Sequence, residues 1–213
     1  MNLMNDNRKV ILFQGDSITD VARTREDPDN LGQGYPSRVA GRLGLDHPGK
    51  YKFYNRGVSG DRIVDIYARM MEDIVTLKPD YMSILAGING VWKGMWGHGV
   101  SVSKFKKVYA LLLQELREEF PDLKIMLLEP FVLPGLATQN DLERFTSETY
   151  LRAQAVRELA EEFGLVFIPL QEELNELLRK APAEYWLFDG VHPTPFFDQY
   201  IADKWIEAFS AMD

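Results

Sequence analysis

The chain has 213 residues, of which 46% are hydrophobic and 26% are charged. This length and balance fit one globular domain over residues 1–213. The formal net charge of −8 disfavours nucleic acids and anionic membrane surfaces as partners, because both require a basic face. The sequence has no cysteine, which excludes disulfides, thiolate metal sites and a thiol nucleophile.

The N-terminal residues 1–9 are polar and lack the apolar core of a signal peptide. No apolar run in the chain approaches membrane-spanning length. We therefore expect a cytoplasmic protein without a membrane partner.

Short apolar runs alternate with longer amphipathic stretches along the chain. The runs are too short and too apolar for surface helices, and they are typical of strands buried on both faces of a parallel sheet. The alternation predicts a doubly wound α/β fold. The predicted strands cover residues 10–13, 51–54, 81–86, 125–128 and 165–168, and the predicted helices cover 62–77, 105–120, 146–163 and 196–209.

Two segments, 87–102 and 130–145, fit neither pattern. The first is crowded with glycine and tryptophan, and the second holds two prolines, a glycine and polar residues. Each follows a predicted strand at its carboxyl end, which is the edge where open α/β sheets bind ligands.

The motif Gly15-Asp-Ser17 follows the first strand, so Ser17 is expected at a strand-to-helix junction where its hydroxyl is exposed. Taken alone, Ser17 with Asp20 also fits an N-terminal capping signature. Far along the chain, Asp189 precedes His192 by three residues, a spacing that lets the carboxylate orient the imidazole. A hydroxyl, an imidazole and a carboxylate are the side chains of a serine hydrolase.

Two further motifs carry possible oxyanion donors. In the 55–61 segment the amide of Gly57 is a candidate, and after the third strand the side-chain amide of Asn89 is another. When each motif is taken alone, a glycine-rich turn and an Asn-Gly turn are the favoured interpretations.

The conjunction of the four motifs, in order and at one edge of the sheet, resembles the SGNH (GDSL-type) hydrolase superfamily. The resemblance covers residues 10–209 and is strongest to the branch of bacterial carbohydrate acetylesterases, including acetylxylan esterases. It implies a three-layer α/β/α, flavodoxin-like fold with a five-stranded parallel sheet, and ester hydrolysis without metal or other cofactor. It further implies Ser17 as nucleophile, His192 as base and Asp189 as its orienting acid, with an oxyanion hole formed by Ser17, Gly57 and Asn89.

Two departures from the superfamily pattern stand out. The third motif usually reads Gly-x-Asn-Asp, whereas residue 90 is glycine, so a carboxylate expected to hold the Asn89 loop is absent. The residues after His192 usually include Ala-Gly-His, whereas this chain has Phe196-Phe197-Asp198. We expect looser placement of Asn89 and altered packing beside the site.

Five residues in or near the motifs are candidate substrate contacts. Flat aromatic faces suit sugar rings, although core packing or a subunit contact would explain each aromatic residue as well. No cluster of histidine and carboxylates has metal-ligand spacing. The candidates are Asp16, Tyr35, Arg56, Trp92 and Trp186.

The favoured function is a serine esterase that removes small acyl groups, acetyl first, from a carbohydrate. An acylated small molecule or oligosaccharide is then the partner, and a homo-oligomer is compatible with the aromatic content. A lysophospholipase or thioesterase is one alternative, although no long apolar lid segment is evident. A carbohydrate-binding protein with weakened catalysis is another, and the glycine at position 90 is the feature in its favour.

Overall fold

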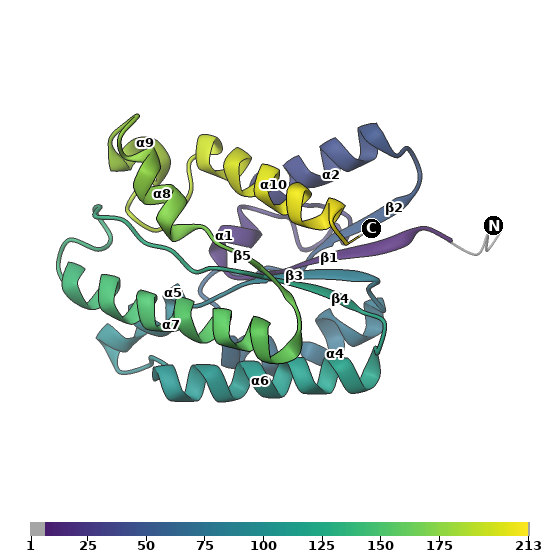
Figure 1. Cartoon of the computed structure of the whole chain (residues 1–213), viewed down its shortest axis with the longest axis horizontal. Helices are drawn as coiled ribbons and strands as arrows, with labels where there is room; N and C mark the ends of the chain where they lie inside the picture. Colours follow the sequence, from purple (N-terminus) through teal and green to yellow (C-terminus); the bar gives the residue numbers. More distant parts are fainter. Residues whose placement is uncertain (1–6, 213) are drawn as a thin grey trace.

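The computed structural model describes residues 7–212 and has five parallel strands with helices on both faces (Figure 1). The strand order is β2-β1-β3-β4-β5. This is the doubly wound, three-layer architecture expected from the sequence. Most of the polar N-terminal segment, predicted to lack a signal peptide, lies outside the described residues. The strands are β1 (Lys9–Gly15), β2 (Tyr51–Asn55), β3 (Tyr81–Leu85), β4 (Lys124–Leu128) and β5 (Val166–Ile168).

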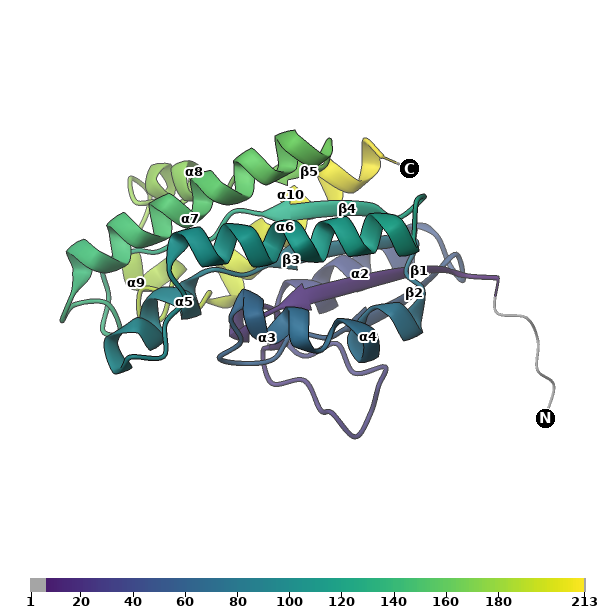
Figure 2. The same cartoon turned by 90° about the horizontal axis from the view of Figure 1, so that it is seen from below.

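Two hydrophobic cores enclose the sheet because successive side chains of a strand point to opposite faces. In β1, Ile11 and Phe13 belong to one core, whereas Leu12 belongs to the other. In Figures 1 and 2 the first core lies under α2 (Tyr35–Asp46) and α10 (Pro195–Ser210). The second core lies under the helices of the opposite layer, α3 (Ile63–Ala68), α4 (Met70–Asp73), α6 (Val102–Glu119) and α7 (Leu142–Phe163).

The predicted helix over residues 62–77 is wrong as a single element. The chain forms α3 and α4, followed by the 3-10 turn η1 (Val75–Leu77). At Arg69 the backbone leaves helical geometry with ψ of 7°, and its amide is shared between the carbonyls of Asp65 and Ile66. The Arg69 side chain reaches two carboxylates, those of Asp61 and Asp73, on either side of this break.

Several helices were not predicted from periodicity. The helix α2 begins with a proline in its first turn, a recognised start signal that its short apolar stripe does not reinforce. The segment 87–102, predicted to be irregular, contains α5 (Ile88–Trp92) and the turn η2 (Lys93–Trp96). The remaining elements are α1 (Ser17–Asp20), α8 (Gln171–Leu177) and α9 (Ala183–Trp186).

Candidate active site

The strand order creates a switch point at the carboxyl ends of β1 and β3. From β1 the chain crosses to β2 on one side, whereas β3 begins the succession that continues to β4 and β5 on the other. Loops diverge at such a point and leave room for a ligand. Ser17 follows β1, the turn at residues 56–61 follows β2, and Asn89 follows β3, so these three motifs meet at this edge.

Ser17 is the first residue of the short helix α1, which begins directly after β1. The helix is capped by Asp16, whose Oδ1 accepts a hydrogen bond from the Ile18 amide at 3.0 Å. Position 15 requires glycine because the backbone of β3 lies close to it: a Cβ there would lie 2.5 Å from the carbonyl oxygen of Leu85. The sequence motif therefore serves capping as well as placement of the hydroxyl.

His192 and Asp189 lie in a tight turn closed by the antiparallel pairing of Leu187 with Pro193. The amide of Phe188 donates to the carbonyl of His192 at 2.8 Å, and this hydrogen bond stabilises the same turn. Asp189 Oδ1 accepts hydrogen bonds from the amides of Val191 and His192, each at 2.9 Å. The other carboxylate oxygen is thereby aimed at the imidazole.

The three side chains form a continuous hydrogen-bonded relay. Ser17 Oγ lies 2.9 Å from His192 Nε2, and His192 Nδ1 lies 2.8 Å from Asp189 Oδ2. Nucleophile, base and orienting acid are therefore within bonding reach, although the serine and the histidine are 175 residues apart. The side chains of His192 and Asp189 are partly exposed, so a substrate can reach the relay.

The pKa shifts in the relay are those of a base held by a carboxylate. Burial alone would raise the pKa of Asp189, but hydrogen bonds from His192 and two amides outweigh it and lower that pKa to about 2. The hydrogen bond to Asp189 raises the pKa of His192, against the opposing effect of burial. Asp189 is therefore ionised at neutral pH and stabilises the imidazolium that forms when His192 accepts a proton.

The structure does not support Gly57 as an oxyanion donor. Its amide already donates to Asn55 Oδ1 at 2.9 Å. Gly57 is instead a packing glycine, since a Cβ there would lie 2.6 Å from the amide nitrogen of Asp20. The glycine in the motif was correctly singled out, but the chain needs it for close approach to α1.

Asn89 on α5 contacts the turn that contains Gly60. Asn89 is buried and its Nδ2 donates to the carbonyl of Asp61 at 3.1 Å, with the carboxylate of Asp16 beside the same side chain. Within residues 7–212 the amide of Gly60 has no acceptor, and this residue has φ of +86°. The sequence pattern does not point to Gly60, because nothing local distinguishes it from Gly57.

Of the five predicted substrate contacts, only Trp92 lies beside the relay; two are buried and two make structural contacts. Its ring lies 5.8 Å from the ring of His192, beside the relay. Asp16 and Tyr35 are 1% and 0% exposed, so neither offers a surface to a substrate and both predictions are wrong. Asp16 serves as the helix cap, and the Tyr35 hydroxyl hydrogen-bonds Thr19 Oγ1 at 3.1 Å beneath α1.

Arg56 and Trp186 make structural contacts instead of contacts with the relay. Arg56 Nη1 donates to the carbonyl of Asn55, and its guanidinium lies over the ring of Tyr54. The indole N–H of Trp186 donates to the carbonyls of Leu177 and Ala181, which ties α9 to the end of α8.

The segment Phe196-Phe197-Asp198 opens α10 and contributes to packing. Phe197 is fully buried with its ring 5.1 Å from that of Phe131. Asp198 is 3% exposed and accepts a hydrogen bond from the Tyr35 amide at 3.1 Å, which caps α2 from another helix. Burial raises the pKa of Asp198 to about 7. The unusual residues thus join α10 to α2.

The glycine at position 90 faces a buried arginine. Arg152 on α7 is fully buried, and a Cβ at Gly90 would lie 3.0 Å from its Nε. That Nε has no hydrogen-bond partner, whereas Nη1 donates to Glu148 Oε2 at 3.0 Å and Nη2 donates to the carbonyl of Val100. The missing carboxylate is evident from the sequence, whereas the arginine beside it is evident only from the structure.

Within residues 7–212, no group of three or more histidine or acidic side chains could hold a metal ion. In the same part of the chain no helix is long and apolar enough to cross a membrane.

Comparisons with known proteins agree with this geometry. The model of the GDSL-like Lipase/Acylhydrolase family matches residues 13–196. An acetylxylan esterase of Geobacillus stearothermophilus is 35% identical over 195 residues, which cover 86% of each chain. A structure from Parabacteroides merdae described as a GDSL-like lipase has a TM-score of 0.89 at 35% identity, covering 97% of both chains. The acetylxylan esterase Axe2 of G. stearothermophilus has a TM-score of 0.83 at 29% identity, covering 96% of both.

The chain belongs to the GDSL-like lipase/acylhydrolase family. It is a carboxylic ester hydrolase with the SGNH hydrolase fold, similar over most of its length to acetylxylan esterases. The resemblance noted from the four sequence motifs is thereby confirmed for fold and reaction class.

Proposed function

We propose that the chain is a serine esterase that removes acetyl groups from carbohydrate through an acyl-enzyme. The observation that carries the proposal is the relay from Ser17 Oγ through His192 to Asp189, with links of 2.9 and 2.8 Å. Solved structures of Axe2 include variants described as catalytic mutants in which a serine, an aspartate or a histidine is replaced by alanine. These are the residue types of the relay in the present chain.

The reaction begins when Ser17 Oγ attacks the acyl carbonyl carbon and its proton passes to His192 Nε2. The imidazolium is stabilised by Asp189, which accepts the hydrogen bond from Nδ1. The C–O bond to the sugar then breaks, and His192 returns the proton to the departing alkoxide. A water molecule, deprotonated by the same imidazole, then attacks the acyl-enzyme. The bond between the acyl carbon and Ser17 Oγ breaks, the imidazolium returns the proton to Oγ, and acetate leaves.

The oxyanion of the tetrahedral intermediate is assigned to three donors. They are the Ser17 amide at the start of α1, the Gly60 amide and the side-chain amide of Asn89. Preorganised donors of this kind stabilise charge as it develops, and removal of one typically costs about 10²–10³ in kcat. A change at Asn89 is therefore expected to act on kcat more than on KM.

A carbohydrate substrate is supported by the relatives and by one residue. Acetylxylan esterases are the curated and structural relatives at 35% and 29% identity. Trp92 presents a partly exposed indole beside the catalytic imidazole, where an aromatic face can pack on a sugar ring. The position of the acetyl group and the sugar itself are to be found by assay.

The test is acetate release from acetylated xylo-oligosaccharides by the wild-type chain, Ser17→Ala and Ser210→Ala. Ser210 is an exposed serine whose hydroxyl donates to the carbonyl of Ile206 in its own helix, so it controls for loss of a hydroxyl. We expect Ser17→Ala to abolish the burst of nitrophenol from nitrophenyl acetate and the release of acetate. Full activity in Ser17→Ala would refute the serine mechanism.

The two alternatives are distinguished in the same experiments. A lysophospholipase or thioesterase would hydrolyse octanoyl esters with higher kcat/KM than acetyl esters, contrary to our expectation. A binding protein with weakened catalysis would bind acetylated oligosaccharide but show no burst that depends on Ser17.

A further inference from the structure

A polar cavity of about 420 Å³ lies beside the turn that carries Gly57 and Gly60. It is formed by the loop after α1, the turn after β2, and α4 with η1, which lie next to one another in Figure 2. Its volume falls within the range of small-molecule sites. Four arginines line it, namely Arg23, Arg25, Arg56 and Arg69.

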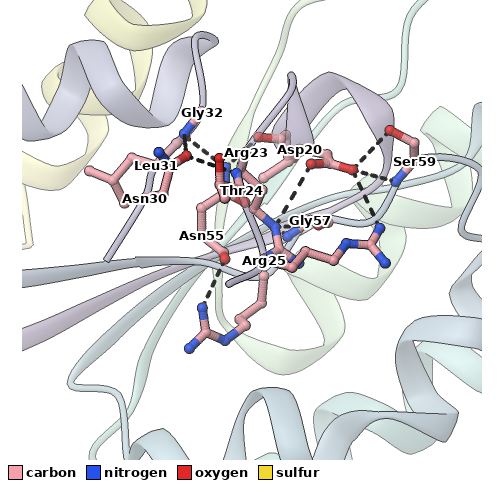
Figure 3. Close-up of polar contacts among 12 residues, drawn as sticks. Asp20, Arg23, Thr24, Arg25, Asn30, Leu31, Gly32, Asn55, Gly57 and Ser59 are labelled. Carbon is pink, nitrogen blue, oxygen red and sulfur yellow. Dashed lines mark hydrogen bonds and ion pairs between the residues drawn. The ribbon is translucent and has the colours of Figure 1, made fainter. Parts of the chain in front are cut away.

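Arg23 is the innermost of these residues, with only 8% of its side chain exposed. Its Nε donates to the carbonyl of Gly57 at 2.8 Å and lies 3.8 Å from Asp20 Oδ1 (Figure 3). Within residues 7–212 the two terminal nitrogens of Arg23 have no hydrogen-bond acceptor. Arg23 lines the cavity, and its terminal N–H groups are open to a ligand.

The nearby carboxylates do not satisfy this charge. Asp20 Oδ2 already accepts two hydrogen bonds from Ser59, each at 2.9 Å, and Figure 3 shows Arg23 and Arg25 converging on this one carboxylate. Arg25 Nη2 stays 3.8 Å from it. Burial lowers the pKa of Arg23, the carboxylates of Asp20 and Asp73 oppose this, and the neighbouring Arg56 and Arg25 lower the pKa further. Such a cluster is costly unless an anion joins it.

The remaining wall of the cavity is closer to neutral. Glu72 and Asp73 line it, and Asp73 is paired with Arg69 at 2.8 Å. Arg56 donates only to backbone carbonyls, those of Asn55 and Pro28. The lining thus holds four guanidinium groups and two carboxylates. Two further carboxylates lie outside the lining: Asp61 pairs with Arg69, and Asp20 lies 3.8 Å from both Arg23 and Arg25.

We propose that this cavity binds a small oxyanion, either the carboxylate of an acidic sugar or a phosphate, held by the guanidinium groups of Arg23, Arg25 and Arg56. Planar guanidinium groups match both carboxylate and phosphate with paired N–H donors. The acidic-sugar source rests on the carbohydrate esterase proposed above, whereas the phosphate source does not.

The cavity is connected to the relay through the turn at residues 56–61. Val58 lines the cavity, and its amide donates to the carbonyl of Gly15 at 3.1 Å, two residues before Ser17. Arg23 holds the carbonyl of Gly57 in the same turn. An anion bound in the cavity would therefore contact the turn that contains Gly60. Binding of the anion is expected to affect the position of the Gly60 amide, which is one of the proposed oxyanion donors.

The test is isothermal titration calorimetry of the Ser17→Ala chain with sodium D-glucuronate and, separately, with inorganic phosphate, at ionic strength fixed with sodium chloride. Arg25→Gln and Arg56→Gln each remove one guanidinium from the cavity. Arg179→Gln is the matched control, since it removes the same charge from a side chain that is 78% exposed and paired with Glu176 elsewhere. Circular dichroism confirms that each variant is folded.

We expect saturable binding that weakens about tenfold or more in Arg25→Gln and in Arg56→Gln, but not in Arg179→Gln. Binding of glucuronate alone identifies an acidic sugar as the source, and binding of phosphate alone identifies phosphate. No saturable binding of either anion, or weakening to the same degree in Arg179→Gln, overturns the proposal. Because the titration uses a variant without its nucleophile, these outcomes are independent of whether the esterase proposal holds.

Discussion

Gly90→Asp restores the carboxylate that the third motif usually carries, and Arg152 provides its partner. The guanidinium is fully buried and Nε is unpaired, with 3.0 Å between Nε and the position of a Cβ on residue 90. Burial lowers the pKa of Arg152, as expected for a cation that is short of partners. A new carboxylate at this point would accept the orphaned N–H.

The magnitude follows from two opposing contributions. A hydrogen bond between charged groups contributes about 1.5–3 kcal/mol, and relief of helical glycine in α5 contributes up to about 1 kcal/mol. Against these, a Cβ contact of 3.0 Å forces Arg152 to shift by a few tenths of an ångström. We expect Gly90→Asp to raise the free energy of unfolding by about 1–3 kcal/mol, or Tm by about 2–4 °C per kcal/mol.

Gly90→Ala is the matched control, because it adds the same Cβ and relieves the same glycine without adding a charge. Chemical denaturation of the two variants, each in the wild-type and Arg152→Met backgrounds, measures the coupling between positions 90 and 152. We expect coupling of about 1.5 kcal/mol or more for the aspartate and near zero for the alanine. Equal stabilisation by Asp and Ala, or no coupling, would refute the assignment of Arg152 as the partner.

The same variant reports on catalysis, since Asn89 is the neighbour of Gly90 in α5. Loss of an entire oxyanion donor costs about 10²–10³ in kcat, so firmer placement of an existing donor is expected to gain about 2- to 10-fold. The gain should appear in kcat with nitrophenyl acetate, with KM unchanged. Higher stability without any rise in kcat would show that Asn89 is already firmly held.

Three further outcomes are expected. Asp189→Asn removes the group that raises the pKa of His192, so the acid limb of the pH profile of kcat/KM should move to lower pH. Activity should fall by up to about 10⁴-fold. An acid limb at the wild-type pH would contradict this prediction. Asp198 has a pKa of about 7 against an ordinary 3.8, so the folded state binds its proton more tightly and stability is lost as pH rises from about 4 to 7. In the wild-type chain this loss amounts to up to about 4 kcal/mol in the free energy of unfolding. In Asp198→Asn the urea-denaturation midpoint should therefore depend less on pH over that range. Gly15→Ala should cost about 1–3 kcal/mol, measured by thermal unfolding, because its Cβ would meet the Leu85 carbonyl.

The parts of the fold that could be predicted from the sequence depend on local signals. The buried strands are apolar runs bounded by glycine, asparagine or proline, and all five appear within a few residues of their expected positions. The helix α7 ends where Gly164, with φ of +62°, adopts the left-handed conformation. The order of the four motifs along the chain likewise sufficed to nominate the relay, because a doubly wound sheet gathers the carboxyl ends of its strands.

The parts that could not be predicted depend on partners distant in sequence. Tyr35 was a candidate substrate contact, yet α2 buries it against Thr19, and the cap for that helix comes from Asp198. Gly57 and Gly60 lie in one turn, and only the position of the Asn55 side chain decides which amide is already occupied. No local pattern distinguishes these cases.

The glycine at position 90 shows how an apparent loss can be offset elsewhere in the fold. The sequence alone predicts a loosened asparagine loop. In the structure the amide of Val100 donates to the carbonyl of Gly90 at 3.3 Å, and the carbonyl of Val100 accepts a hydrogen bond from Arg152. The arginine therefore holds the loop through the backbone in place of a side-chain carboxylate. For this reason Gly90→Asp should tune stability and kcat by modest factors, whereas Arg152→Met should loosen Asn89 more than any change at residue 90.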